Sequence, residues 1–234
     1  ITKTIYDCCA GTGGMLSVAE EYLKELNPEA RLEVFGQELN AESYAICKSD
    51  LLIKGQNASN IKKGNSISED KLASEKFDYL ITNPPFGVKW EKFAKPVKAE
   101  HEQLGHGGRF GAGLPSVSDG SFLFLMHLMS KMKRPEDGGS RLALVFNGSP
   151  LFSGSPSKTK NESSIRQWII ENDLLEAVIA LPNQLFYNTG ISTYVWVISN
   201  HKPTVRKGKV QLINAIDFSK KMSKSLGNKR NEIT

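Results

Sequence analysis

Short apolar runs alternate along this chain with longer segments in which apolar residues recur at helical spacing. The short runs predict buried strands, and the longer segments predict helices that pack on them. Strands that alternate with helices are typical of an α/β fold with a doubly wound, mostly parallel sheet and helices on both faces. The expected strands cover residues 4–9, 31–38, 77–82, 141–146, 176–181 and 194–199, and the expected helices cover residues 13–26, 41–53, 122–132 and 165–172.

Two segments interrupt this alternation. Residues 87–118 are rich in glycine and lysine without regular apolar spacing, so we expect either a functional loop or a disordered segment there. Residues 148–162 are rich in serine, glycine and proline. Because the chain begins inside its first expected strand and ends in a polar run, we expect a piece of a longer protein. Its main domain would cover residues 1–218, and residues 219–234 would start a truncated region.

A glycine-rich turn, Asp-Cys-Cys-Ala-Gly-Thr-Gly-Gly, joins the first expected strand to the first expected helix. Such a turn lies at the carboxyl end of a parallel strand, where open α/β sheets bind ligands, and its glycines let the backbone approach a ligand closely. Glu38, at the end of the next strand, can accept hydrogen bonds from ribose hydroxyls. The predicted cofactor-binding residues are therefore Asp7, Ala10, Gly11, Thr12, Gly13, Gly14 and Glu38.

Two cofactors compete for this turn. A dinucleotide fingerprint requires a third glycine where Leu16 stands, and the carboxylate of Asp7 suits a methionine ammonium group better than a pyrophosphate. We therefore predict S-adenosylmethionine as the cofactor. A dinucleotide, and a tight turn that binds nothing, are the alternatives.

A second motif, Asn83-Pro84-Pro85-Phe86, follows the expected strand 77–82 and so lies at the same edge of the sheet. An exocyclic amino group conjugated to an aromatic ring is a poor nucleophile, because its lone pair is delocalised. The side-chain oxygen of Asn83 and the carbonyl oxygen of Pro84 can accept its two N–H groups and localise the lone pair for attack on a sulfonium methyl group. Phe86 offers a face on which a flipped base can stack.

The four residues of this motif are the predicted catalytic residues, and a stiff turn that only ends a strand is the alternative. Attack on a sulfonium methyl group needs no general base, so we interpret the four histidines as structural or surface residues: His101, His106, His127 and His201. Methylation of carbon 5 of cytosine would need a nucleophilic cysteine, usually after proline, and the sequence contains no Pro-Cys pair.

With these motifs, the chain resembles the methylation (modification) subunits of type I restriction-modification systems, which are γ-class N6-adenine DNA methyltransferases. The downstream stretches RLALVF, IRQWIIENDLLEAVIALP and LFYNTGISTYVWVIS extend the resemblance over nearly the whole chain. It implies a seven-stranded, Rossmann-like methyltransferase sheet whose last strand, residues 194–199, is antiparallel. The family usually has an acidic residue at its third cofactor motif, where this chain has Asn65, and we include Asn65 among the predicted cofactor-binding residues.

The resemblance also implies the substrate and the partners. The substrate would be the 6-amino group of a flipped adenine in double-stranded DNA. The partners would be a specificity subunit and a restriction subunit, with two methylation subunits in each complex. The chain's own sequence also indicates that a separate protein must recognise the DNA sequence. Only residues 87–118 are left over from the expected elements, which is too little for a folded DNA-recognition region. That segment has five basic residues that can touch phosphates: Lys89, Lys92, Lys95, Lys98 and Arg109.

Two other functions stay open from the sequence. One is a methyltransferase that acts on a protein glutamine amide, whose nitrogen is also planar and conjugated. The other is a nucleic-acid-binding scaffold that has lost catalysis.

Composition changes this interpretation little. The residues are 39% hydrophobic and 24% charged, as in ordinary globular proteins, and the net charge of +5 permits a polyanionic partner. Without a run of 18 apolar residues or a secretory signal, we expect a cytoplasmic protein with no membrane partner. Cys8, Cys9 and Cys47 fit reduced thiols, and no cysteine–histidine spacing predicts a metal.

Overall fold

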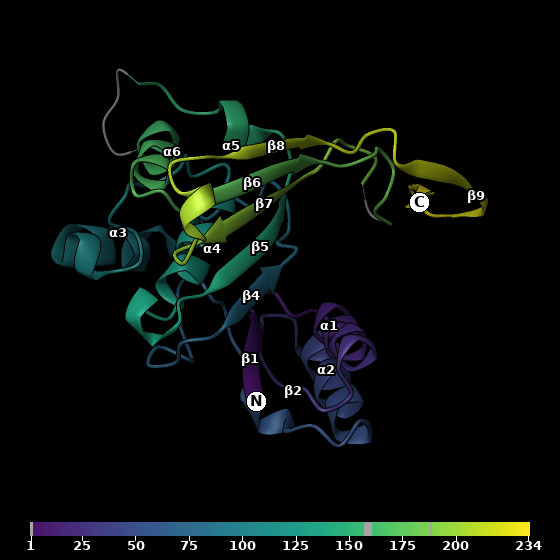
Figure 1. The fold of residues 1–234 in the computed structure, drawn as a ribbon. Coiled ribbons are helices and arrows are strands. Elements are labelled where there is room, and N and C mark those ends of the chain that lie inside the picture. Colours follow the sequence, from purple (N-terminus) through teal and green to yellow (C-terminus); the bar gives the residue numbers. More distant parts are fainter. Residues whose placement is uncertain (1, 157–160, 188) are drawn as a thin grey trace.

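The computed structural model describes residues 2–156, 161–187 and 189–234. Its centre is an eight-stranded sheet in the order β3-β2-β1-β4-β5-β7-β6-β8 (Figure 1). Neighbouring strands are parallel, except that β7 runs antiparallel to β5 and to β6. The strands are β1 (Thr2–Asp7), β2 (Arg31–Glu38), β3 (Ile61–Lys63), β4 (Tyr79–Thr82), β5 (Arg141–Phe146), β6 (Leu175–Ala180), β7 (Tyr194–Ser199) and β8 (Gln211–Asn214).

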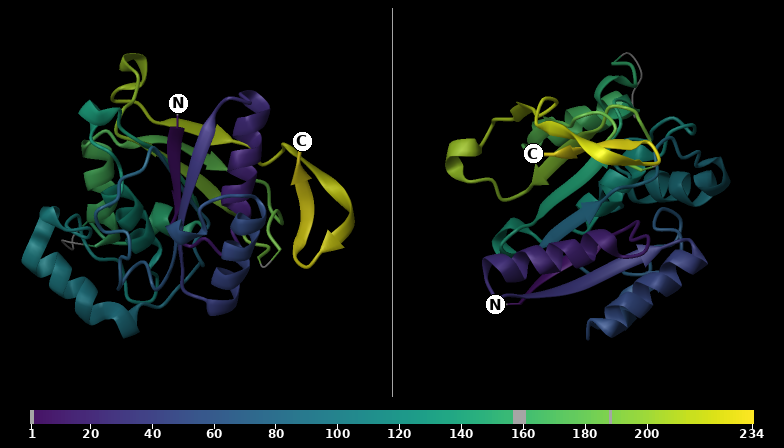
Figure 2. Two further views of the ribbon diagram at one scale, coloured as in Figure 1. Left: turned by 90° about the horizontal axis from the view of Figure 1, so that it is seen from below. Right: turned by 90° about the vertical axis from the view of Figure 1, so that its right-hand side faces the viewer.

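Helices cover both faces of this sheet (Figure 2). Ile5 and Tyr6 are adjacent in β1, so their side chains point to opposite faces. Ile5 packs in a core with buried residues of α1 and α2, whereas Tyr6 belongs to the larger core that includes α4 and α6. The predicted doubly wound α/β fold is thereby confirmed. The helices are α1 (Gly14–Leu26), α2 (Ala41–Ile53), α3 (Ala94–Leu104), α4 (Ser121–Ser130), α5 (Ser149–Phe152) and α6 (Glu162–Glu171).

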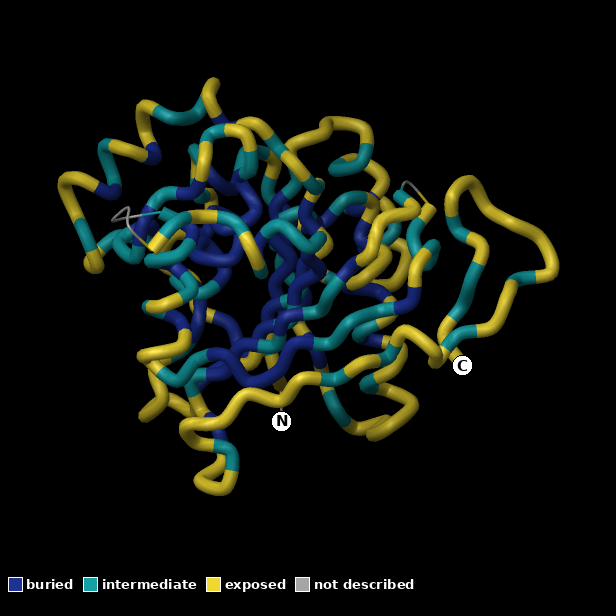
Figure 3. Tube along the Cα trace, turned by 90° about the horizontal axis from the view of Figure 1, so that it is seen from above, coloured by how far each residue is buried: buried dark blue, intermediate teal, exposed yellow. Residues whose placement is uncertain are grey.

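The antiparallel strand is β7, as expected, but the sheet extends further than the predicted seven strands. β8 pairs with β6 in parallel at the outer edge. After β8, the chain forms a separate antiparallel hairpin of β9 (Ser219–Leu226) and β10 (Lys229–Ile233), where only a polar run was expected. In Figure 3 the buried part of the trace lies in the middle of the domain, whereas the hairpin beside the C-terminus is exposed or half-buried.

Residues 87–118 are more ordered than the sequence predicted, because they contain α3. This helix buries only Val97 and His101. Since one of these two residues is a polar histidine, the helix has almost no apolar stripe that sequence analysis can detect. Residues 148–162 contain α5 and the start of α6, and residues 157–160 of that segment lie outside the described residues.

The parallel strands place the two sequence motifs together. β1, β2 and β4 are neighbours that run in the same direction, so the turns after Asp7, Glu38 and Thr82 lie at one edge of the sheet. Within the described residues, no helix is long and apolar enough to cross a lipid bilayer.

Candidate active site

The glycine turn between β1 and α1 depends on two residues with left-handed backbone conformation. Gly11 has φ +55°, and Gly13, the N-cap of α1, has φ +88°. A Cβ atom at Gly13 would lie only 2.8 Å from the sulfur atom of Cys47 on α2. Both backbone angle and space therefore require glycine at position 13. Hydrogen bonds from Gly13 N to Ala10 O (2.8 Å) and from Ala10 N to Gln37 O (3.1 Å) close the turn and fix it to β2.

Glu38 lies at the carboxyl end of β2, beside this turn. Its two carboxylate oxygens accept hydrogen bonds from the backbone amides of Gly11 (2.8 Å) and Asn40 (2.7 Å). Each oxygen keeps further acceptor capacity, because an ionised carboxylate has about four lone-pair positions. The carboxylate is thus held at a fixed place next to the turn and can still accept hydrogen bonds from a ligand.

The carboxylate of Asp7 lies underneath the turn. It is almost completely buried and accepts hydrogen bonds from the Thr82 hydroxyl (2.8 Å) and from the Cys9 amide (2.9 Å). Burial raises the pKa of Asp7 to about 6, although both hydrogen bonds act to lower it. Contact of Asp7 with a methionine ammonium group stays a prediction. What the structure shows is that Asp7 connects the glycine turn to the end of β4.

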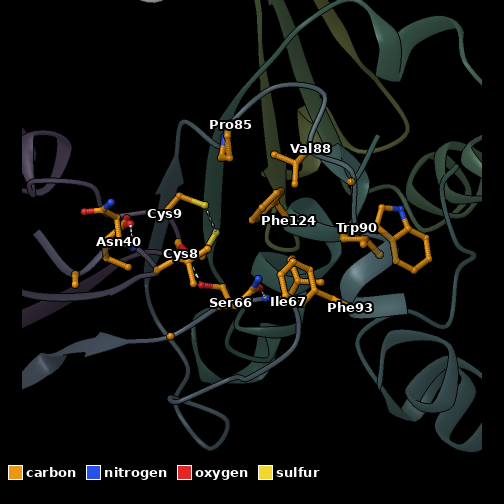
Figure 4. A pocket seen from close by; sticks show the side chains of 17 residues that line it. Cys8, Cys9, Asn40, Ser66, Ile67, Pro85, Val88, Trp90, Phe93 and Phe124 are labelled. Atoms are coloured by element: carbon orange, nitrogen blue, oxygen red, sulfur yellow. Dashed lines mark hydrogen bonds between the residues drawn. The ribbon is translucent and has the colours of Figure 1, made fainter. Parts of the chain in front are cut away.

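A cavity of about 570 Å³ opens at this edge of the sheet (Figure 4). Its size is within the usual range for small-molecule sites. Three of the predicted residues line it: Glu38, Asn65 and Pro85. The rest of its lining is mainly apolar and comes from five regions: Cys8 and Cys9 in the glycine turn, Leu39, Asn40 and Ala41 after β2, Gly64, Ser66 and Ile67 after β3, Val88, Trp90 and Phe93 after the Asn-Pro-Pro-Phe motif, and Gly120, Leu123 and Phe124 at the start of α4.

Sequence reasoning missed most of these apolar lining residues. Leu39 and Ile67 are close in sequence to the predicted Glu38 and Asn65, so proximity to those polar residues was the available signal. Trp90 and Phe93 belong to residues 87–118, in which the sequence predicted no helix or strand. Phe124 is on the buried helix α4, where a cavity-lining residue has the same apolar pattern as a core residue.

Asn65 forms a tight turn with its side chain. The side-chain oxygen accepts from the backbone amides of Ile67 (2.9 Å) and Ser68 (3.3 Å). The Ser66 hydroxyl donates to the carbonyl oxygen of Cys8 (2.6 Å). The loop after β3 is therefore attached to the glycine turn, and the two together form one wall of the cavity.

The motif after β4 exposes the side chain of Asn83. Asn83 and Pro85 are exposed, Pro84 is buried and Phe86 is half-buried. Within the described residues, the Asn83 side chain has no hydrogen-bond partner, so its oxygen can accept from a substrate. The predicted site residues that do not line the cavity are Asp7, Ala10, Gly11, Thr12, Gly13, Gly14, Asn83, Pro84 and Phe86.

Arg109 does not have the exposed position that a phosphate-binding role needs. Its guanidinium is mostly buried, forms an ion pair with Glu100 of α3 (2.6 Å), and donates to the carbonyl oxygens of Ser66 (2.8 Å) and Ile67 (2.9 Å). The expectation that Arg109 touches DNA phosphates is therefore wrong. Arg109 holds the loop after β3, which lines the cavity. The exposed lysines of the same segment, Lys89, Lys92, Lys95 and Lys98, still fit the prediction.

Two histidines have the structural role that was expected. His127 is fully buried between the Tyr6 hydroxyl (3.0 Å) and the Arg109 guanidinium (3.1 Å), and burial lowers its pKa to about 3. It is therefore neutral, with Nδ1 as acceptor and Nε2–H as donor. His101 contacts the carbonyl oxygen of Phe110 (2.6 Å). The three cysteines are free thiols, and burial raises the pKa of Cys47 to about 11. Over the described ranges, no group of three potential ligands is placed to hold a metal ion.

The comparison with protein families agrees with this geometry. The model of the N-6 DNA methylase family matches residues 1–234. This chain belongs to the N-6 DNA methylase family. The resemblance to type I methylation subunits noted from the sequence is confirmed, because curated relatives of this chain are methylase subunits of type I restriction enzymes.

Two such relatives come from Methanocaldococcus jannaschii and Haemophilus influenzae. The type I restriction enzyme MjaIX methylase subunit of Methanocaldococcus jannaschii is 30% identical over 223 residues, which are 94% of this chain and 38% of the relative. The HindI methylase subunit of Haemophilus influenzae is 29% identical over 215 residues, which are 90% of this chain and 44% of the relative. The chain thus spans about two fifths of the length of the curated relatives that it matches.

A solved structure has the same fold. The methyltransferase subunit of a type I restriction-modification system from Streptococcus thermophilus superimposes with a TM-score of 0.78 at 26% identity. The match covers 99% of this chain and 45% of that chain. This chain therefore corresponds to part of the longer Streptococcus thermophilus subunit.

Proposed function

We propose that this chain is the catalytic domain of an S-adenosylmethionine-dependent methyltransferase that acts on the 6-amino group of adenine in DNA. One observation carries the proposal. The same cavity is lined by Cys8 and Cys9 of the glycine turn, by Glu38, and by Pro85 of the Asn-Pro-Pro-Phe motif. A cofactor in this cavity would lie next to the exposed Asn83, at the place where an incoming amino group can be held.

The cavity fits the cofactor by its chemistry. Its polar groups are few and fixed, as in other small-molecule sites, and the rest of the lining is apolar. Glu38 would accept hydrogen bonds from the ribose hydroxyls, while Leu39 and Ile67 would pack against the adenine ring. Gly11 and Gly13 would let the turn approach the methionine part. When bound, S-adenosylmethionine would supply an electrophilic methyl group, because breaking the bond between the sulfonium sulfur and that methyl releases a neutral thioether, which is a good leaving group.

The chain's own residues would then act on the target base. The side-chain oxygen of Asn83 and the carbonyl oxygen of Pro84 would accept the two N–H groups of the amino nitrogen and localise its lone pair. Phe86, which is half-buried, would stack on the flipped base. Fixed acceptors cost no reorganisation during the reaction, so positioning and hydrogen bonding supply the rate enhancement.

The proposed context is a type I restriction-modification complex in the cytoplasm. The full protein would act on double-stranded DNA as the methylation subunit, together with a specificity subunit and a restriction subunit. Two methylation subunits would be present in each complex. The relatives support this context, because they are named as methylase subunits of type I restriction enzymes. A separate specificity subunit also agrees with the fold, in which residues 87–118 support the cavity and form no DNA-reading domain.

A methyl-transfer assay tests the proposal. The full-length protein with its partner subunits is incubated with labelled S-adenosylmethionine and mixed duplex DNA, and the methylated base is identified after digestion. We expect N6-methyladenine, and its loss in the variant Asn83→Ala. Label on a protein glutamine instead of on DNA would identify a protein methyltransferase. DNA binding without any methyl transfer would identify an inactive scaffold.

A further inference from the structure

The β9–β10 hairpin contains most of the chain's net positive charge. Between Ser219 and Ile233 there are five basic residues and one acidic residue, whereas the whole chain has a net charge of +5. Only one ion pair, between Lys220 and Glu232 (3.3 Å), is present among the described residues of the hairpin. The other four cations, which no carboxylate neutralises within the described structure, are Lys221, Lys224, Lys229 and Arg230.

The hairpin does not contribute to the core. Each of its residues is exposed or half-buried, and its two strands pair only with each other. It is nevertheless fixed to the domain by backbone groups. Asn228 N donates to Tyr187 O (2.9 Å), and Arg230 N donates to Gln184 O (2.9 Å). An element that buries no side chain yet is held in place by hydrogen bonds presents its charges on a defined surface.

The hairpin stands on the same edge of the sheet as the candidate active site. β8 runs parallel to β6, so the chain leaves β8 at the carboxyl edge of the parallel strands and enters the hairpin there. The loop that anchors the hairpin also follows the carboxyl end of β6. Figures 1 and 2 show the hairpin projecting beyond this edge, to which the ends of β4 and β6 also point. Lys89 and Lys92, just after the Asn-Pro-Pro-Phe motif, are exposed at this edge too.

We infer that the β9–β10 hairpin binds the phosphate backbone of the duplex from which the target base is taken. The inference rests on the proposed function. A flipped base stays attached to its duplex, so the duplex must lie across the edge of the sheet where Asn83 is exposed. Because the duplex extends to both sides of the target base, its other phosphates lie over neighbouring elements at this edge. Unpaired lysine and arginine side chains on a projecting ribbon match a row of phosphates, and each contact releases condensed counterions.

The test compares two variants of the full-length protein in its complex. The hairpin variant combines Lys221→Gln with Lys224→Gln. The control combines Lys207→Gln with Lys209→Gln, which removes two exposed lysines from the β7–β8 connection, at the opposite edge of the sheet. Both variants lose the same charge. Duplex DNA affinity is measured at several salt concentrations, together with S-adenosylmethionine affinity, complex assembly and the methylation rate at saturating DNA.

For the hairpin variant we expect DNA affinity to fall about tenfold near physiological salt, and the slope of log affinity against log salt to decrease by about 1–2. Cofactor affinity and the rate at saturating DNA should stay unchanged, and the control should behave as wild type. Equal DNA binding by both variants would overturn the inference. Loss of subunit assembly with unchanged DNA binding would also overturn it, because the hairpin would then be a protein-docking element. If the wild-type complex methylates no DNA, the proposed function fails instead.

Discussion

The hydroxyl group of Thr82 donates a hydrogen bond of 2.8 Å to the buried carboxylate of Asp7. Asp7 is the last residue of β1, before the glycine turn, and Thr82 is the last residue of β4, before Asn83. This one contact therefore fixes the position of the proposed cofactor turn relative to the proposed catalytic loop. Among the described residues, Asp7 is buried with two hydrogen-bond donors, so its contact with Thr82 is sensitive to the charge of the carboxyl group.

The first prediction concerns pH and Asp7. Burial raises the pKa of Asp7 from 3.8 to about 6, so the folded state holds the proton more tightly than the unfolded state. The ionised carboxylate is thus unfavourable in the folded protein, and its contribution to stability falls as pH rises from about 4 to about 6. A shift of this size corresponds to about 3 kcal/mol. In urea unfolding, the free energy of unfolding of Asp7→Asn should exceed that of wild type by an amount that grows as pH rises through this interval, up to about 3 kcal/mol.

Asp78 provides a comparison of opposite sign. Burial opposes its ionisation, but hydrogen bonds from Lys133 and Lys3 lower the pKa of Asp78 well below 3.8. Asp78→Asn should therefore destabilise the protein at neutral pH, and its difference from wild type should shrink as pH falls below about 4. A difference between Asp7→Asn and wild type that does not change with pH would contradict the assignment of Asp7.

The second prediction concerns the glycine turn. Gly13→Ala places a Cβ atom against Cys47 Sγ and puts a non-glycine residue at φ +88°. We expect a loss of about 1–2 kcal/mol in the free energy of unfolding and weaker S-adenosylmethionine binding in titration calorimetry. Gly55→Ala is the control, because Gly55 has φ +71°, a Cβ atom there would meet no other atom within 4 Å, and the residue is remote from the cavity lining. It should cost stability without changing cofactor affinity.

The third prediction concerns Asn83. Asn83→Ala removes one acceptor for the amino group and should lower the single-turnover rate of methyl transfer by about 100-fold or more. Cofactor affinity should change little, because Asn83 is outside the cavity lining. A near-normal single-turnover rate in this variant would refute the catalytic role of Asn83.

The fourth prediction concerns base capture by Phe86. Phe86→Ala should weaken binding of a duplex with an unpaired target adenine by about 1–3 kcal/mol, since the base loses its stacking partner. Phe86→Trp should keep most of the affinity, because it retains an aromatic face. Fluorescence anisotropy measures both variants. Equal losses in the two would show that the size of Phe86, rather than its aromatic face, matters.

The fifth prediction concerns Arg109. Arg109→Lys cannot maintain the paired contacts with Glu100 and also donate to the carbonyl oxygens of Ser66 and Ile67. The loop after β3 should loosen, so cofactor affinity should fall about tenfold, with about 1–3 kcal/mol lost from stability. Lys98→Gln, an exposed substitution on α3, should leave both quantities unchanged. Normal cofactor affinity in Arg109→Lys would show that Arg109 only supports α3.

Local patterns were enough to predict most of the elements around the site, but not β3 or α3. β2, α2, β5 and β7 have the predicted bounds, because continuous apolar runs and helical spacing are determined by neighbouring residues. The glycine turn and the Asn-Pro-Pro-Phe motif were assigned to one edge of the sheet, because parallel strands bring their carboxyl ends together. Family membership could be inferred from the order of these two motifs together with the downstream stretches RLALVF, IRQWIIENDLLEAVIALP and LFYNTGISTYVWVIS.

Contacts between distant residues could not be predicted in this way. The approach of Arg109 to Ser66 and Ile67 joins segments about 40 residues apart, and that of Asp7 to Thr82 joins segments 75 residues apart. Neither contact leaves a periodic signal, because each depends on how whole elements pack. The same holds for Phe124, which lines the cavity only because α4 packs where it does. The sequence by itself determined most of the strands and helices of the domain, the two motifs and the family. The tertiary structure decided which buried polar groups connect the motifs and which surface holds the charge, because both depend on packing between distant segments.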